Sequence, residues 1–210
     1  MKVGREPVVK AGLHLLNEVG LDGLTLRAIA AELGVRAPTL YWRFKNKQDL
    51  IDEMATQVIN DWIAGLMDIP PEMTWQQATE RFGIGVRQAL LRYRDGARMV
   101  AGSYLTDPKL YGKMEAVLAL YDRAGFSLQE AAACLGTVYA YVIGFTIEEQ
   151  AVIFHTGERN PQYDLAKRDE RIDSTIHPRA KEVGALLFDN YDARFERGLR
   201  AILAGFANHD

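Results

Sequence analysis

The segment Val35-Arg36-Ala37-Pro38-Thr39-Leu40-Tyr41-Trp42-Arg43-Phe44-Lys45-Asn46-Lys47, residues 35–47, decides the fold of this chain. Within it, only Leu40 and Phe44 are spaced to face a core, and the other positions carry mainly cations, hydroxyls and aromatic rings. No acidic residue follows before Asp49. Lys and Arg neutralise phosphates, and Thr and Tyr hydroxyls bond phosphate oxygens or base edges. The segment therefore indicates a short helix that binds a polyanion, and DNA is the first expectation.

Two helices are predicted before this segment. Pro7 suits the first turn of a helix that runs to Val19 and is closed by Gly20. Thr25 can cap a second helix, which has apolar residues at helical spacing and ends at Gly34. The basic segment follows after a short turn, so the second and third helices match the helix-turn-helix pattern, whose second helix enters the major groove. The first helix supplies the third wall of this head.

Composition bounds the class of protein. The chain has 210 residues, 48% of them hydrophobic, which is ample for a packed core. Residues 1–50 hold eight Lys and Arg against five Asp and Glu, whereas the whole chain has a net charge of -3, so the basic end is a separate functional surface. Cys134, the only cysteine, is expected to be a small core residue. No secretory signal is recognised, and we expect a cytoplasmic protein.

The segment from Ala131 to Ile147 carries no charge and is at the lower limit of length for a membrane-spanning helix. Glycines interrupt it, and Glu130 and Glu148 flank it without basic residues. We therefore expect a helix that is buried among other helices, and no membrane partner.

The rest of the chain shows dense helix punctuation and almost no strand signal. Asn46 with Asp49 begins a fourth helix that runs to about Met67, before Pro70-Pro71. We place the domain boundary at its start, which gives a head of residues 1–46 and a body of residues 47–210. The predicted fold class is all-α.

Capping signals divide the body into further helices. Thr74 with Gln77 makes a capping box for a helix that reaches about Tyr93, and Ser127 with Glu130 makes another for a helix that reaches about Phe154. Between them lie a short segment over residues 97–104 and a helix from Asp107-Pro108 to near Gly125. Residues 156–177 are polar and are expected to form a loop or partly helical excursion, before a last helical region that starts at His177-Pro178.

Two apolar stripes in the body predict a helical pair. One consists of Phe188, Tyr191, Phe195, Leu199, Ile202 and Phe206, and the other of Leu128, Ala131, Leu135, Val138, Val142 and Phe145. Two such pairs form a four-helix interface between subunits; the alternative is packing within one chain only. A homodimer through the helices near residues 127–154 and 188–207 is favoured, because two helix-turn-helix heads reading half-sites one turn apart gain specificity and affinity.

Short motifs that belong together run through most of the chain. In the head they are Leu15-Leu16-Asn17-Glu18-Val19-Gly20, Gly23-Leu24-Thr25, Leu33-Gly34-Val35, Pro38-Thr39-Leu40-Tyr41-Trp42 and Lys45-Asn46-Lys47. In the body they include Arg94-Asp95-Gly96-Ala97, Gly125-Phe126-Ser127-Leu128 and Glu148-Glu149-Gln150. Together they resemble the TetR family of bacterial transcriptional repressors, and more closely its tetracycline-repressor branch. The resemblance implies a three-helix DNA head, a linking fourth helix and a ligand-binding, dimerising body.

The resemblance also implies DNA contacts. Carried over by position, base and phosphate contacts fall on Thr25, Arg27, Pro38, Thr39, Tyr41, Trp42 and Lys47, with Ala37 and Arg43 at positions that vary with the operator. Chemistry suits Arg43 to guanine O6 and N7, and Tyr41 and Lys47 to phosphate. Arg36 is either a solvated steering charge or a base contact. The alternative for Trp42 is a core aromatic.

The effector pocket departs from the branch. Tetracycline repressors hold a metal-chelated drug with two histidines, with amides and with a glutamate; here Ile63 and Val100 replace the histidines, Phe82 and Val117 replace the amides, and Glu148 alone matches. Aliphatic side chains cannot ligate a divalent cation, so we expect neither a metal nor a cofactor. The matching pocket positions are Ile63, Leu66, Phe82, Val86, Val100, Ser103, Tyr104, Met114, Val117, Gly136, Ala140 and Glu148.

This lining favours a lipophilic or aromatic effector, with Ser103, Tyr104 and Glu148 as orienting groups and with volume left by Gly136 and Ala140. The alternative is a filled core, with Glu148 paired at the surface. The expected function is a ligand-responsive repressor that binds a palindromic operator as a homodimer. Two alternatives are a TetR-like regulator without a small-molecule effector and a metal-dependent enzyme that uses Glu148, Glu149, His155 and His177, although these four lack a metal-binding spacing. We expect no catalytic residues.

Overall fold

The head has the three predicted helices. A computed structural model describes residues 4–64, 69–70, 72–105 and 107–207. In it, α1 is Arg5–Gly23, α2 is Leu26–Glu32 and α3 is Ala37–Tyr41. Gly20 leaves helical geometry at a φ of 70°, and the Thr25 hydroxyl accepts the Ala28 N–H at 3.0 Å, which confirms the predicted helix end and cap. Leu40 and Phe44 are fully buried, as their spacing requires.

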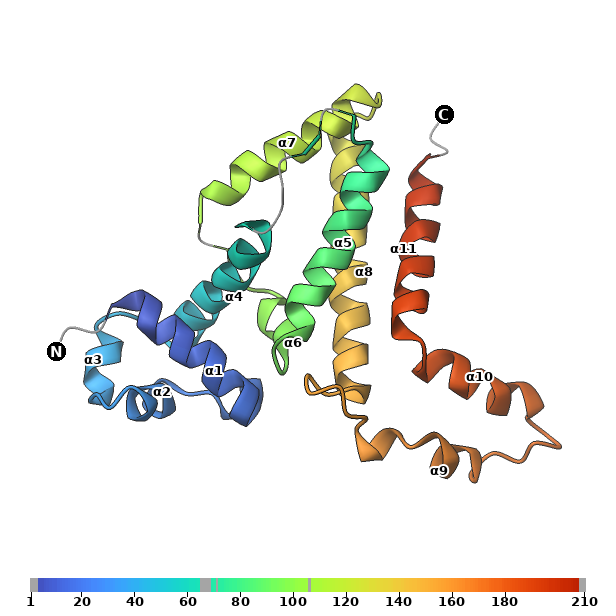
Figure 1. Cartoon of the computed structure of the whole chain (residues 1–210), viewed down its shortest axis with the longest axis horizontal. Coiled ribbons are helices and arrows are strands. Elements are labelled where there is room, and N and C mark those ends of the chain that lie inside the picture. Colours follow the sequence, from blue (N-terminus) through green and yellow to red (C-terminus); the bar gives the residue numbers. More distant parts are fainter. Residues whose placement is uncertain (1–3, 65–68, 71, 106, 208–210) are drawn as a thin grey trace.

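The helix α4, Lys47–Ala64, links the head to the body. Asn46 Oδ1 accepts the Asp49 N–H at 2.9 Å, and Asp49 Oδ2 accepts the Lys45 N–H at 2.9 Å, so the predicted start is confirmed. The predicted end near Met67 lies outside the described residues. Because α4 contacts α1 as well as α5 and α6, it belongs to both parts of the molecule (Figure 1).

The body is built around the long helix α8, Leu128–Val152, which contacts α5 (Trp75–Leu91), α6 (Gly96–Val100), α7 (Lys109–Arg123) and α11 (Tyr191–Ala207). Both predicted capping boxes are present, at Thr74 with Gln77 and at Ser127 with Glu130. The described residues are mainly helical, and their one isolated β-bridge joins Ile153 and Arg159. The all-α prediction is therefore confirmed.

The predicted pairing of the last region with α8 is confirmed, but its details differ. Phe195 and Leu199 are fully buried, and Leu199 lies where α11 meets Gly83 and Val142. The stripe is not continuous, because Asn190 at a φ of 52° separates α10 (Pro178–Phe188) from α11, so Phe188 lies in another helix. Leu128 is 71% exposed, since it stands at the first turn of α8 beyond the packed region.

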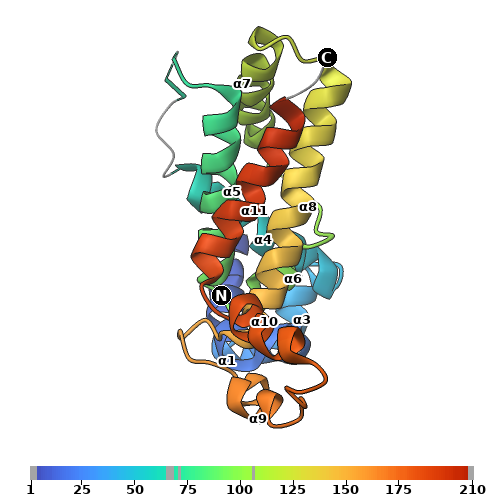
Figure 2. The same ribbon diagram turned by 90° about the vertical axis from the view of Figure 1, so that its right-hand side faces the viewer.

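Residues 156–177 form the expected partly helical excursion. It contains a 3-10 turn over Pro161–Tyr163 and the short helix α9, Leu165–Asp169, and it leads into α10 at the lower end of the body (Figures 1 and 2). Arg159 holds the start of the excursion against the α10–α11 junction by bonding the Phe188 carbonyl at 2.9 Å and the Asp189 carboxylate.

A buried ion pair holds α5, α8 and α11 together. Arg87 and Glu149 are both buried, and their side chains form two hydrogen bonds, Nε to Oε2 at 2.7 Å and Nη2 to Oε1 at 2.6 Å. Arg87 Nη1 also donates to Asp192 Oδ1 at 2.7 Å, and the guanidinium carbon lies 5.0 Å from the centre of the Phe195 ring. These contacts compensate the desolvation of the two charges.

Candidate nucleic-acid interface and effector-binding body

The predicted DNA contacts lie at an exposed end of the head. Trp42 is 89% exposed and Tyr41 is 58% exposed, which excludes the core-aromatic alternative for Trp42. The reason is local: Leu40 and Phe44 occupy the inner face of α3 and of the turn after it, so the intervening side chains point outward. The other exposed members of the predicted set are Thr25, Arg27, Arg36, Pro38 and Arg43, and the half-buried ones are Ala37, Thr39 and Lys47.

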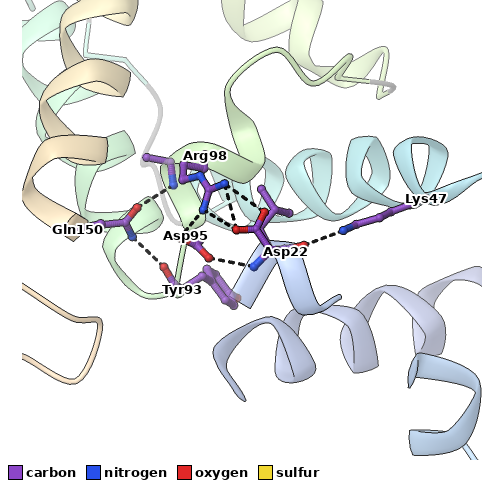
Figure 3. A network of polar contacts seen from close by, with 8 residues as sticks. Asp22, Lys47, Tyr93, Asp95, Arg98 and Gln150 are labelled. Atoms are coloured by element: carbon purple, nitrogen blue, oxygen red, sulfur yellow. Dashed lines mark hydrogen bonds and ion pairs between the residues drawn. The ribbon is translucent and has the colours of Figure 1, made fainter. Parts of the chain in front are cut away.

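Lys47 has a partner within the head. Its Nζ donates to the Leu21 carbonyl at 2.7 Å, near the end of α1 (Figure 3). The bond joins the start of α4 to α1 and places the ammonium at the edge of the head. Its assignment to phosphate stays a prediction, and phosphate binding there must compete with the Leu21 carbonyl.

The turn between α5 and α6 joins the head to the body. Asp95 Oδ2 accepts the Leu21 N–H at 2.9 Å, and Asp95 adopts the left-handed conformation at a φ of 56°. Arg98 donates to Asp22 Oδ1 at 3.2 Å and to Asp95 Oδ1 at 3.3 Å (Figure 3). Gly96 is required beside them, because a Cβ there would lie 2.2 Å from the Leu90 carbonyl oxygen.

Gln150 of α8 holds this turn from the other side. Its Nε2 donates to the Leu90 carbonyl at 3.1 Å. The same Nε2 donates to the Tyr93 carbonyl at 2.8 Å, and Gln150 Oε1 accepts the Ala97 N–H at 3.0 Å (Figure 3). A continuous set of hydrogen bonds therefore runs from α8 through the turn to Leu21 and Lys47. In the sequence, Arg94-Asp95-Gly96-Ala97 served only as part of the resemblance to the TetR family, and its part in joining the head to the body was not predicted.

Two hydrogen bonds fasten the connection between α6 and α7 to α4. Asp52 Oδ1 accepts the Tyr104 N–H at 3.2 Å, and Asn60 Nδ2 donates to Asp107 Oδ2 at 2.8 Å. The pKa of Asp107 lies below its ordinary value, mainly because its carboxylate accepts the Lys109 N–H and also because of the Asn60 amide. These two bonds therefore tie the connection to the helix that carries the head.

The predicted effector positions do not form one closed set. Val86 and Val100 are buried, whereas Ile63, Phe82 and Val117 are half-buried on α4, α5 and α7. Ser103 is half-buried in the connection after α6. Tyr104 is 70% exposed, and Met114 and Glu148 are also exposed. Ser103 Oγ donates to the Met99 carbonyl at 2.7 Å, so its hydroxyl hydrogen already has an acceptor. Leu66 lies outside the described residues.

Gly136 and Ala140 are placed differently from the expectation. Both are exposed, and a Cβ on Gly136 would meet no atom within 4 Å. They lie on the outer face of α8 because Val138 and Val142 point into the body. In a single chain these two small residues therefore face solvent, and their place in an effector cavity stays a prediction.

The residues of the alternative enzyme do not converge. Glu149 is buried against Arg87, whereas Glu148, His155 and His177 are exposed on other surfaces. Across the part of the chain that the structure describes, no group of three His, Cys, Asp or Glu side chains is arranged to hold a metal ion.

A helix-turn-helix head with exposed cations and aromatics, joined by α4 to a helical body, defines a DNA-binding transcriptional regulator. Residues 8–54 match the family model for bacterial regulatory proteins of the tetR family, and residues 69–209 match that for the tetracyclin repressor-like C-terminal domain. The chain belongs to the TetR family of transcriptional regulators, with a DNA-binding head and a ligand-binding domain.

Its relatives extend over nearly the whole chain. The tetracycline repressor protein class A from transposon 1721 of Escherichia coli is 36% identical over 98% of this chain and 91% of its own length. A possible TetR family regulator from Streptomyces coelicolor A3(2) is 35% identical, with a TM-score of 0.83 over 97% of this chain and 98% of that one. TetR of class A in complex with 5a,6-anhydrotetracycline and magnesium is 32% identical, with a TM-score of 0.67 over 97% of each chain.

Proposed function

We propose that this protein is a cytoplasmic, homodimeric repressor that binds a palindromic operator and is released by a small lipophilic or aromatic effector. The observation that carries the proposal is the pair of hydrogen bonds at Leu21, to Asp95 and Lys47, which connects the proposed DNA-binding surface of the head to the body. A regulator needs such a connection, because an effector changes operator affinity only if it binds one arrangement of head and body better than the other.

The exposed residues support binding to duplex DNA. The exposed Arg36 and Arg43 suit guanine edges or phosphates. Tyr41 and Trp42 add a hydroxyl and an indole N–H on exposed side chains. We propose that the short α3 enters the major groove of the DNA. Thr25 and Arg27, at the start of α2, are proposed to contact the phosphate backbone of the DNA.

The outer faces of α8 and α11 support a dimer. Figure 2 shows the two helices side by side on one face of the body. The exposed small residues Ala133, Gly136, Ala140 and Gly144 run along α8. The helix is long and apolar enough to cross a membrane, yet only 33% of its most apolar stretch is buried within one chain. A second copy of this chain packing there removes this apolar face from water and forms a four-helix interface.

The effector is proposed to differ from that of the class A relative, whose structure contains an anhydrotetracycline and magnesium. Ile63 and Val100 offer no donor to a metal, and the half-buried Phe82 and Val117 offer no amide to a polyhydroxylated drug. We propose instead that apolar compounds bind between α4, α6 and α7, where the Asp52 and Asn60 bonds hold the connection that must move.

The test is an operator-binding titration with the full chain. Operator DNA is first selected from a random duplex pool, and candidate effectors are then screened for those that release it. We expect a compound that lowers operator affinity and whose own affinity falls by the same factor in the presence of operator. A compound that binds the body and leaves operator affinity unchanged contradicts the repressor switch. Operator binding that needs the effector instead indicates activation or co-repression.

A further inference from the structure

An open groove lies along α5, between that helix, Trp62 of α4 and the described residues just before α5. Its volume is about 700 Å³. The residues that shape it are Trp62 of α4, Pro70 and Met73 of the connection, and Arg81, Ile84 and Gly85 of α5. None of the effector positions that the structure describes lines it, so the groove is separate from them.

Trp62 forms a fixed wall of this groove. Its indole lies directly on Gly85, where a Cβ would be 2.1 Å from Nε1, and its ring centre is 5.4 Å from that of Phe82 at an interplanar angle of 73°. Glycine is therefore needed in the middle of α5, where it otherwise weakens a helix. Within the described chain, the indole N–H has no hydrogen-bond acceptor.

Two carboxylates and one guanidinium line the groove, those of Glu72, Glu80 and Arg81. Glu80 is paired with Arg200, Nε to Oε1 at 3.2 Å, and Glu72 is exposed to solvent. Arg81 is half-buried and has no carboxylate partner in the part of the chain that the structure describes. A half-buried guanidinium without a counter-ion beside apolar side chains is typical of a site for an anionic group carried on an apolar body.

We propose that the groove binds a small planar aromatic monocarboxylate. The ring system packs against Trp62, Met73 and Ile84, and the carboxylate pairs with the Arg81 guanidinium in the two-pronged geometry that Arg offers to carboxylates. Since Trp62 belongs to α4 and Arg81 to α5, a bound ligand fastens the helix that carries the head to the body.

The test uses 1-naphthoate, neutral 1-naphthalenemethanol and cationic 1-naphthylmethylammonium, each titrated calorimetrically into the full-length protein. We expect 1-naphthoate to bind most tightly. Arg81→Gln should weaken 1-naphthoate by about tenfold and leave the neutral probe unaffected, because it removes one charge-assisted pair. Gly85→Ala should weaken both probes, because its Cβ displaces the indole. Circular dichroism and thermal melting confirm that each variant is folded.

Arg92→Gln is the matched control, because Arg92 is exposed beyond the last residue of α5 and does not line the groove. It should bind 1-naphthoate as the unchanged protein does. The proposal is overturned if Arg81→Gln leaves 1-naphthoate affinity unchanged, or if the ammonium probe binds more tightly than 1-naphthoate. It is also overturned if the affinity responds to Val117→Trp and not to Arg81→Gln, which places the ligand between α4, α6 and α7. None of these results depends on operator binding, so the outcome is independent of the repressor proposal.

Discussion

The Asp95 carboxylate of the body accepts the main-chain N–H of Leu21 in the head at 2.9 Å. The Leu21 carbonyl accepts a hydrogen bond from Lys47 Nζ at 2.7 Å. Leu21 is therefore bonded to the body through its amide and to α4 through its carbonyl. A single residue at the end of α1 thus connects the turn between α5 and α6 with the start of the helix that carries the head. The joint is polar and directional, so a small displacement of either side breaks it.

Asp95→Ala should loosen this joint. It removes the acceptor for Leu21 and the partner of Arg98, and it places alanine at a φ of 56°. We expect a loss of roughly 1–3 kcal/mol in the free energy of unfolding, measured by urea denaturation. Asp95→Asn should lose less, because asparagine tolerates this conformation and keeps an acceptor oxygen. Equal stability of the alanine variant and the unchanged protein contradicts a structural role for the joint.

Trp42→Ala should separate DNA binding from folding. Because Trp42 is 89% exposed, its removal should change the free energy of unfolding by no more than about 0.5 kcal/mol. Operator affinity, measured by fluorescence anisotropy, should fall by about tenfold if the indole contacts DNA. Trp75→Ala gives the opposite pattern as a control: Trp75 is buried, so stability should fall by roughly 3–5 kcal/mol. Unchanged operator affinity of Trp42→Ala removes this residue from the interface.

Arg87→Met should destabilise the body strongly. It leaves the Glu149 carboxylate buried without its partner, which costs roughly 3–5 kcal/mol in chemical denaturation. The double variant Arg87→Met with Glu149→Leu should recover much of this loss, because no buried charge then remains unpaired. If the single variant is as stable as the unchanged protein, the pair contributes nothing beyond packing.

Ala140→Arg should disrupt the proposed dimer. An arginine at the middle of the exposed face of α8 prevents the close approach of a second α8, so sedimentation equilibrium should show a monomer that remains helical. Ala119→Arg, on an exposed face of α7, is the matched control and should sediment as the unchanged protein does. A dimer that survives Ala140→Arg places the interface elsewhere.

The Cys134 thiol should be inert in the folded protein. It is fully buried beside the Tyr121 hydroxyl at 3.3 Å, and burial raises its pKa. Since the thiolate is the reactive form, reaction with Ellman's reagent at mildly alkaline pH should be slower by about a hundredfold or more than in guanidinium chloride. Fast reaction of the native protein means that the region between α7 and α8 opens readily.

The sequence by itself determined the helices and the kind of head. The helix starts at Thr25, Asn46, Thr74 and Ser127 depend on hydrogen bonds between residues three apart. Such starts can be predicted from the neighbouring residues alone. Leu40 and Phe44 are likewise spaced to fill the inner face, although only the structure excluded a core position for Trp42. The head, with its exposed cations and aromatics, could therefore be predicted before any tertiary contact was known.

Only the tertiary structure decided how the parts are joined and which surfaces stay free. Asp95 and Leu21 are 74 positions apart, and Arg87 and Glu149 are 62 apart, so no local pattern specifies that they meet. Likewise, the sequence of α8 is apolar on every side, so it does not tell which face is buried. Packing against α5 and α11 leaves Gly136 and Ala140 exposed. Local hydrogen bonds select the helices, whereas the burial of apolar faces between distant segments selects their arrangement.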